Sequence, residues 1–262
     1  MIKLLRPMLA PAMRRVLQDR FSLGELEQVI QGMWRNYDDL AQDLPAEPTL
    51  GARIMVRLAA MTVGLHESLR EAGLTEEEAG ERTSQVTWLV YEKLTGPPWK
   101  LTALLAKRRI ARVRRVMDWS MRFPYGPPGY QMQYVQAEEN TVAFDVHRCP
   151  AADYFARQGL SELCVSAFCN LDYPLADKWG VTLERSQTLA GGATHCDFRF
   201  RPRCEQKGEL MREKLRAALD WLRGFLEAMM GAPAYDEAAF QQQIRELVGG
   251  VKKDEQPPHP DR

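Results

Sequence analysis

Residues 181–202, VTLERSQTLAGGATHCDFRFRP, decide the fold of the second half of this chain. Apolar and polar residues alternate on both sides of Gly191 and Gly192. This alternation predicts a β-hairpin, in which side chains point to opposite faces with period two. The residues of one face are Val181, Leu183, Arg185, Gln187 and Leu189 in the first strand and Cys196, Phe198 and Phe200 in the second.

The predicted buried face of this hairpin contains an arginine. An unpaired charge is too costly to bury, so Arg185 must have an anionic partner. A ligand can supply that partner. The hairpin is therefore the first candidate for a binding site.

A second hairpin is predicted upstream. Residues 130–136 and 141–147 alternate as strands around a turn at 138–140. Helical periodicity follows at 150–158 and 161–179, and again beyond the opening hairpin at 207–230 and 232–247. The expected fold class is α+β: an N-terminal helical region followed by an antiparallel sheet of about four strands packed with helices.

The first half of the chain has the pattern of several helices. Ser22 and Glu25 form a capping-box signature at the start of the second of them. A long apolar helix is expected over 49–72, and Thr75 with the acidic residues after it opens another. We expect that helix to end before the GPP sequence at 96–98, because proline does not continue a helix.

Residues 100–122 predict a basic amphipathic helix. Its apolar side would hold Leu101, Leu104 and Leu105, with lysines and arginines on the other side. Such a helix can lie on a membrane surface or on a phosphate backbone. A solvated or interdomain helix is the commoner outcome, and the rest of the chain has no excess of positive charge.

The sequence FPYGPPG at 123–129 marks the clearest boundary in the chain. It predicts a helical region over 1–124 and an α+β domain carrying the site over 130–231. A C-terminal helix and a tail would occupy 232–262. The last residues have no apolar content, and we expect them to be disordered.

Composition excludes several classes of protein. The chain has 262 residues, 35 basic and 35 acidic, so its formal net charge of zero argues against a dedicated nucleic-acid binder. No apolar run reaches the roughly 20 residues of a membrane span, and the first residues lack the apolar region of a signal peptide. We expect a cytoplasmic protein that binds neither nucleic acid nor membrane; the sequence leaves a homo-oligomer open.

The five cysteines all lie in the second half, with no CxxC pair. Reduced thiols are therefore expected rather than disulfides, and the spacing gives zinc little support. No metal or cofactor is predicted. The common nucleotide, zinc-protease and serine-hydrolase motifs are also missing from the sequence.

Several reactive side chains are expected to converge. Cys149 ends a strand, Cys169 and Asp172 lie three apart on one helix face, and Arg185 and Cys196 share the inner face of the hairpin. A cation near a thiol favours the nucleophilic thiolate. The arrangement points to chemistry at a cysteine.

These residues lie in motifs that resemble the L-2-amino-thiazoline-4-carboxylic acid hydrolase family. The motifs are RCP at 148–150, FCNLDY at 168–173, ERSQTL at 184–189 and CDFRF at 196–200, with looser similarity at 71–79. The resemblance implies hydrolytic opening of a small cyclic, non-peptide C–N substrate. The named example is the conversion of an aminothiazoline carboxylate to carbamoyl-cysteine.

Within that resemblance, physical reasoning suggests roles. Arg185 would clamp the substrate carboxylate through its planar guanidinium. Cys196 would attack the ring carbon or stabilise its adduct. Asp172, with Cys169 beside it, would activate water or protonate the leaving atom.

Four further residues are weaker candidates. Asp197 follows Cys196 directly, so in a regular strand the two cannot enter one pocket without a bulge. Thr188 and Cys149 are polar candidates for substrate binding, although Thr188 could instead support the hairpin. His66 stands alone beside an apolar helix stripe and is more often a core histidine than a catalyst.

An alternative hypothesis comes from a different class. The thiols could hold a metal, a cluster or a small effector in a regulatory module without hydrolase activity, with the basic helix contacting an anionic partner. A third hypothesis is a helical interaction protein that has kept the fold without the activity.

Overall fold

The computed structural model describes residues 6–203. These residues fall within one compact unit that spans 1–203. Cys204, the helices predicted at 207–230 and 232–247, and the predicted disordered tail lie outside the described residues. The domain boundaries predicted from the sequence stay predictions.

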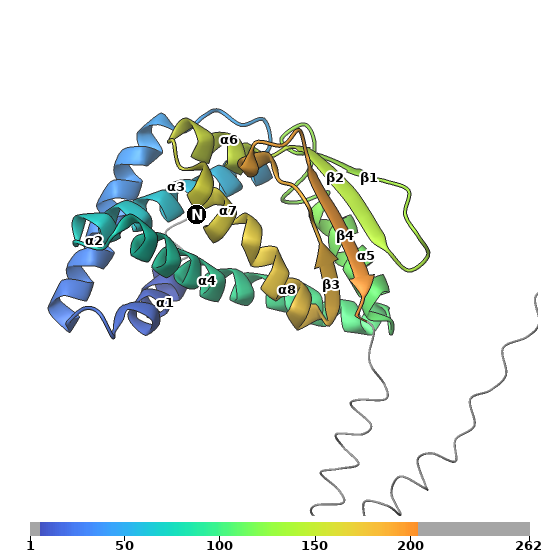
Figure 1. The fold of residues 1–262 in the computed structure, drawn as a ribbon, viewed down its shortest axis with the longest axis horizontal. Helices are drawn as coiled ribbons and strands as arrows, with labels where there is room; N and C mark the ends of the chain where they lie inside the picture. The colour runs from blue at the N-terminus through green and yellow to red at the C-terminus, as the bar shows by residue number, and fades with distance from the viewer. Residues whose placement is uncertain (1–5, 204–262) are drawn as a thin grey trace, which may run out of the picture. The chain divides into compact units, whose positions relative to one another are not determined.

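Helices form most of the described chain, and Figure 1 shows them beside a single sheet. The α-helices are α1 Arg6–Leu17, α2 Leu23–Leu40, α3 Leu50–Glu71, α4 Glu76–Leu105, α5 Arg109–Ser120, α6 Pro150–Arg157, α7 Ser161–Ala167 and α8 Asp172–Trp179. The short 3₁₀ helices are η2 Ala41–Asp43, η3 Cys169–Leu171 and η4 Leu189–Gly191. The predicted α+β class is confirmed.

Capping residues set the starts of α2 and α4 as the sequence predicts. The Ser22 side chain accepts from the Glu25 backbone, and the Ser22 N–H donates to the Glu25 carboxylate at 2.8 Å, which completes the capping box. The Thr75 side chain accepts from the Glu78 N–H at 3.2 Å. Both caps satisfy backbone donors that the first helical turn leaves unpaired.

The predicted end of α4 before residues 96–98 is wrong. The helix runs through Pro97 and Pro98 to Leu105. Tertiary packing accounts for the difference, because Trp99 stacks on Trp179 with ring centroids 4.9 Å apart. The contact holds the chain beyond the prolines in helical geometry, against their intrinsic preference.

The predicted continuous helix over 100–122 is also wrong. Residues 100–105 are the last turns of α4, the chain breaks at 106–108, and α5 starts at Arg109. In α5, Val113 and Val116 are buried. Leu101, Leu104 and Leu105 are instead exposed.

Four antiparallel strands form the sheet, in the order β1-β2-β4-β3. Their bounds are β1 Gln131–Tyr134, β2 Val142–Arg148, β3 Val181–Glu184 and β4 Cys196–Pro202. Both predicted hairpins are present, and Leu183 faces Phe200 across β3 and β4. The two predicted apolar faces of residues 181–202 are therefore the same buried face.

Two details of these segments differ from the prediction. The first strand of the opening hairpin ends at Glu184, and the connection to β4 contains η4 and a left-handed Gly192 instead of a tight turn. The segment 161–179 is not one helix, since Phe168 leaves helical geometry between α7 and η3. The Phe168 ring packs on Phe155 at 5.4 Å, and this contact accompanies the break.

Two hydrophobic clusters form the core of the described residues. One joins α1–α4 with α6 and α7, including Met33, Leu69 and Phe155. The other packs α5 and α8 on the inner face of the sheet, including Val113, Trp179 and Phe200. Cys149 and Cys169 are packed against the first cluster, and Cys149 also contacts the second.

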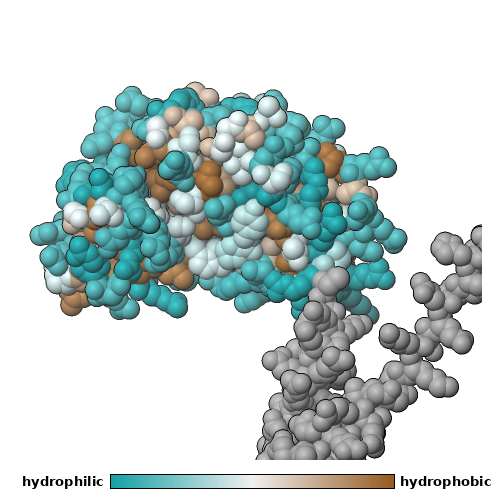
Figure 2. Space-filling view, viewed as in Figure 1, coloured by the Kyte–Doolittle hydropathy of each residue, from teal (hydrophilic) through white to brown (hydrophobic). Residues whose placement is uncertain are grey.

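Hydrophilic residues cover most of the visible face of residues 6–203, and hydrophobic residues occur there in small separate groups (Figure 2). None of the helices in this range is both long and apolar enough to cross a lipid bilayer.

Candidate functional site

The four cysteines of the described chain converge where the two hydrophobic clusters meet. All four are free thiols: Cys149 after β2, Cys164 on α7, Cys169 on η3 and Cys196 at the start of β4. Cys149, Cys169 and Cys196 each lie close enough for their charge to affect the ionisation of another thiol of the group, and Cys164 is hydrogen-bonded to Cys169. The predicted convergence of Cys149, Cys169 and Cys196 is thus seen in the structure, and Cys164 joins them.

Arg185 organises the turn that carries Cys169. Its Nη1 donates to the Cys169 carbonyl oxygen at 2.9 Å and to Oδ2 of Asp172 at 3.3 Å. Its Nη2 donates to Oδ1 of Asn170 at 3.1 Å. The side chain is only 2% exposed. The anionic partner that the sequence required for this buried arginine is Asp172, a carboxylate of the chain itself.

Aromatic rings cover the Arg185 guanidinium. Its Cζ lies 5.0 Å from the Tyr173 ring centroid and 5.2 Å from that of Phe198. The Tyr173 hydroxyl also donates to the Arg185 carbonyl oxygen at 3.0 Å. These contacts hold the arginine in one geometry beside Asp172.

Asp172 sits between a cation and a phenol. The Tyr91 hydroxyl donates to Oδ1 of Asp172 at 3.2 Å, on the other side from Arg185. Burial raises the pKa of Asp172 to about 6, against the opposite effects of Arg185 and Tyr91. A carboxyl group with this pKa can gain or lose a proton near neutral pH, which suits a general acid or base.

Cys169 is the thiol that the site favours as a thiolate. The Cys164 thiol donates a hydrogen bond to Cys169 and lowers the pKa of Cys169; burial acts against this, and the Arg185 charge lowers the pKa further. The same hydrogen bond, together with burial, raises the pKa of Cys164. Cys164 therefore keeps its proton and stabilises the charge on Cys169.

The other two thiols are held in the neutral form. Burial raises the pKa of Cys149 to about 12, although the Ala152 N–H and the Tyr130 hydroxyl favour its thiolate. Burial also raises the pKa of Cys196 to about 11, although its sulfur accepts from the Leu189 N–H at 3.2 Å. Among these thiols, Cys169 therefore ionises more readily than Cys196.

Sequence reasoning missed the tyrosines of this site. Tyr91 comes from α4, and Tyr125 and Tyr130 come from the segment between α5 and β1, with ring centroids 5.0 Å apart. Burial, followed by the nearby Asp172 and Cys149, raises the pKa of Tyr125. No local pattern marks these residues, because their elements meet Asp172 and Cys149 only through the fold.

Asp197 and Thr188 support the loop between β3 and β4. Asp197 accepts from the N–H groups of Ser186 and Gln187 at 3.0 and 2.9 Å and from the Ser186 hydroxyl at 2.7 Å. Thr188 accepts from the Gly191 N–H at 2.9 Å and caps η4. Cys196 is buried beside them in the chain, so the two neighbours, Cys196 and Asp197, point to different surroundings.

His66, another predicted site residue, lies beside an acid of a different helix. It lies on α3, and its Nε2 is 3.1 Å from Oε1 of Glu76 at the start of α4. Glu76 precedes Tyr91 by about four helical turns along α4. Burial lowers the pKa of His66, as expected for a core histidine.

Within residues 6–203, no group of three or more His, Cys, Asp or Glu is arranged to hold a metal ion. The alternative of a metal-binding module gains no geometric support from this part of the chain.

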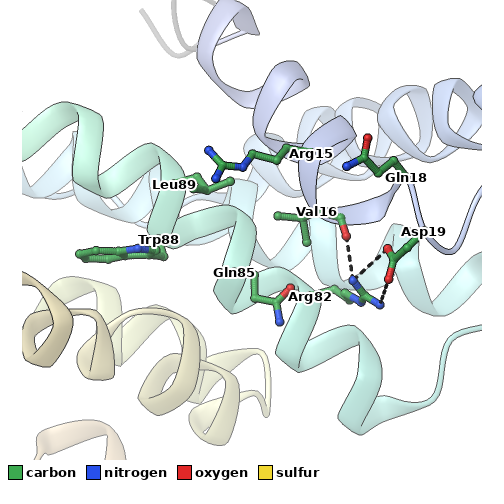
Figure 3. Close-up of a pocket in the computed structure, with 8 residues that line it drawn as sticks. All are labelled: Arg15, Val16, Gln18, Asp19, Arg82, Gln85, Trp88 and Leu89. Atoms are coloured by element: carbon green, nitrogen blue, oxygen red, sulfur yellow. Dashed lines mark hydrogen bonds and ion pairs between the residues drawn. The ribbon is translucent and has the colours of Figure 1, made fainter. Parts of the chain in front are cut away.

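A surface pocket lies between α1 and α4, where Arg82 points toward Asp19 (Figure 3). Arg82 binds this carboxylate through both Nη atoms, at 3.1 and 2.8 Å. None of the predicted site residues lines this pocket.

Comparison with known proteins gives one informative match. Residues 84–200 match the family model of L-2-amino-thiazoline-4-carboxylic acid hydrolase. The predicted family resemblance is confirmed. The matched range contains the whole cluster around Arg185, from Tyr91 to Cys196, so the thiols and the carboxyl lie inside the segment that resembles these hydrolases.

Other comparisons add little. No curated protein sequence matches the chain. The crystal structure of a mutant Fe(II) unliganded H-NOX protein from K. algicida is similar over 76% of this chain and 97% of that chain, at 8% identity and a TM-score of 0.34. A score this low does not define a shared fold.

Proposed function

We propose that this protein is a hydrolase that opens a small cyclic, amidine-like C–N substrate bearing a carboxylate, such as 2-amino-thiazoline-4-carboxylate. The hydrolase family match over 84–200 supports the reaction class. The observation that carries the proposal is the clamp of Arg185 on both the Cys169 carbonyl and the Asp172 carboxylate. It places a thiol and a titratable carboxyl on one turn.

The nucleophile of the proposed reaction is Cys169. Its thiolate adds to the ring carbon between sulfur and nitrogen, and one ring bond of that carbon breaks. Protonated Asp172 gives its proton to the released ring atom. Water then adds to the thiol-bound carbon and passes a proton back to Asp172. The carbon–Cys169 bond breaks, and the former ring carbon becomes the carbamoyl carbon of the product.

This proposal assigns Cys196 and Arg185 differently from the sequence interpretation. Because its pKa is raised, Cys196 stays neutral and lines the site in this scheme. Its sulfur accepts a hydrogen bond from the Leu189 N–H. Arg185 is a positioning residue in this scheme. To clamp a substrate carboxylate it would have to release Asp172 or Asn170, which it contacts in the free protein.

Steady-state turnover of 2-amino-thiazoline-4-carboxylate by the full-length chain tests the proposal. Cys169→Ala should lower kcat by orders of magnitude, and Cys196→Ala should keep most of the activity. Asp172→Asn should lower kcat by about 10²–10⁴-fold, the usual contribution of a general acid or base. Asp177→Asn is a matched control, because Asp177 lies on the same helix and is exposed.

The outcomes separate the assignment from the reaction. A strong loss in Cys196→Ala with an active Cys169→Ala would return the nucleophile to Cys196. A wild-type protein that does not turn over this compound would refute the named substrate.

A further inference from the structure

Three leucines at the C-terminal end of α4 are exposed. Leu101 is 52% exposed, Leu104 83% and Leu105 51%, although the sequence pattern places all three on a buried face. The buried residue of these last turns is Thr102, whose hydroxyl donates to the Trp99 carbonyl oxygen and accepts from Arg112. The short helical end therefore contacts the body of the protein through Thr102, and the leucines point elsewhere.

Basic side chains surround these leucines. Lys100, Lys107 and Arg108 are exposed, and no ion pair within residues 6–203 involves them. The sequence from Lys93 to Met117 contains no Asp or Glu, although the whole chain has a formal net charge of zero. We call the six residues Leu101, Leu104, Leu105, Lys100, Lys107 and Arg108 the α4-tip surface.

Two other arginines nearby, Arg112 and Arg114, are engaged in the fold. Arg112 donates to the Trp99 carbonyl oxygen at 2.8 Å and lies 3.9 Å from the Trp99 ring centroid. Arg114 lies 3.9 Å from the Tyr134 ring centroid and 3.7 Å from Asp118. These contacts give Arg112 and Arg114 a role in the fold. The basic residues of the α4-tip surface have no such ion pair within residues 6–203.

We propose that the α4-tip surface docks on a lipid bilayer that carries anionic headgroups, in contrast to the expectation from the sequence that the protein binds no membrane. Exposed leucines insert at the boundary between headgroups and acyl chains, while flanking lysines and arginines bind the negative surface. Both features occur here within one short segment. A contact of this kind stays at the membrane surface and requires no spanning helix.

The leucines distinguish a membrane from a nucleic acid. A phosphate backbone is bound by cations, and its affinity does not depend on apolar side chains inserted into an acyl layer. A nucleic-acid surface would therefore use the basic residues and gain nothing from Leu104. Charge alone fits either partner, and the exposed apolar residues favour the lipid.

Co-sedimentation of the full-length protein with vesicles tests the proposal. The vesicles are pure phosphatidylcholine, or phosphatidylcholine with about 30% phosphatidylglycerol, within the range in which surface charge attracts basic segments. Binding to the anionic vesicles should exceed binding to the neutral ones and should weaken with added salt. The Lys107→Gln/Arg108→Gln variant should bind about 30-fold more weakly.

Matched variants isolate the leucines. Leu104→Gln/Leu105→Gln should weaken binding to anionic vesicles at least tenfold, on the order expected for loss of inserted apolar groups. Leu23→Gln is the control, because Leu23 is 85% exposed at the start of α2. Arg15→Gln/Arg53→Gln is the charge control, since both residues are exposed on other helices. Circular dichroism checks that every variant is folded.

Three results would overturn the proposal. One is equal binding to neutral and anionic vesicles. Another is unchanged vesicle binding by the leucine variant. The third is tight binding of an oligonucleotide that depends on Lys107 and Arg108 but not on Leu104, which would identify a nucleic-acid surface. None of these measurements uses catalysis, so they are independent of the proposed hydrolase activity.

Discussion

The Tyr91 hydroxyl donates a hydrogen bond to Oδ1 of Asp172 at 3.2 Å, while Arg185 holds Oδ2 of the same carboxylate. Tyr91 lies on α4 and Arg185 follows β3, so elements distant in the sequence meet at one acid. Both donors favour the charged form of Asp172 and burial opposes it. The balance gives a carboxyl group that titrates near neutral pH.

Removal of the Tyr91 hydroxyl should shift the pH dependence of the reaction. In Tyr91→Phe the carboxylate loses a donor, so the pKa of Asp172 should rise above its value of about 6. The limb of the kcat/KM profile that reports Asp172 should therefore move to higher pH. Tyr37→Phe, a buried tyrosine in the other hydrophobic cluster, serves as control. An unshifted profile with merely reduced activity would mean that Tyr91 only supports packing.

Asp172 should also make the stability of the protein depend on pH. Its folded-state pKa of about 6 lies above the ordinary 3.8, so the folded protein binds this proton more tightly than the unfolded chain does. The stability gained from the proton is complete below about pH 4 and is lost as pH rises through 6. The loss amounts to about 3 kcal/mol, from roughly two pKa units.

The variant Asp172→Asn tests this dependence, because asparagine resembles the protonated acid. Wild type should lose up to about 3 kcal/mol of unfolding free energy between pH 3.5 and pH 8 through this group, and the variant should lack this loss. Urea unfolding at both pH values measures the difference. An equal loss of stability between the two pH values in wild type and variant would show that Asp172 does not cause the dependence.

Thiol labelling should identify the most reactive cysteine. The Cys164 hydrogen bond and the Arg185 charge favour the Cys169 thiolate, whereas burial keeps Cys149 and Cys196 neutral. Iodoacetamide at pH 7 should therefore modify Cys169 first, as mapped by peptide mass spectrometry. The rate at Cys169 should fall in Cys164→Ala, which lacks the donor thiol. Faster modification of Cys196 than of Cys169 would contradict the assignment.

Loss of Arg185 should destabilise the fold strongly. Arg185→Ala leaves the Asp172 carboxylate without its cation and the Cys169 carbonyl without its donor. Breaking a buried ion pair on one side costs about 3–5 kcal/mol. Arg201→Ala is the comparison, since Arg201 is 41% exposed and pairs with Glu184 and Glu138; it should cost about 1 kcal/mol or less. Equal losses in the two variants would refute a special role for Arg185.

Local patterns in the sequence determined much of this fold. The alternation in residues 181–202 identified the buried face shared by Leu183 and Phe200, because strand side chains alternate whatever surrounds them. Ser22 and Glu25 identified the start of α2, since a capping box involves only neighbouring residues. The need for an anionic partner at Arg185 also followed from the sequence, because burial of a charge has the same cost in any fold.

The groups that meet in the site are brought together by tertiary packing. Asp172 pairs with Arg185, and Tyr91 donates a hydrogen bond to the same carboxylate. Cys164 is hydrogen-bonded to Cys169. These contacts depend on packing between elements that no local sequence pattern relates. Tertiary packing also carried α4 through Pro97 and Pro98, where the stack of Trp99 on Trp179 outweighs the local preference of proline. Sequence periodicity predicts which face a residue occupies; the partner across that face depends on the whole fold, because contacts between distant segments form only when the chain is packed.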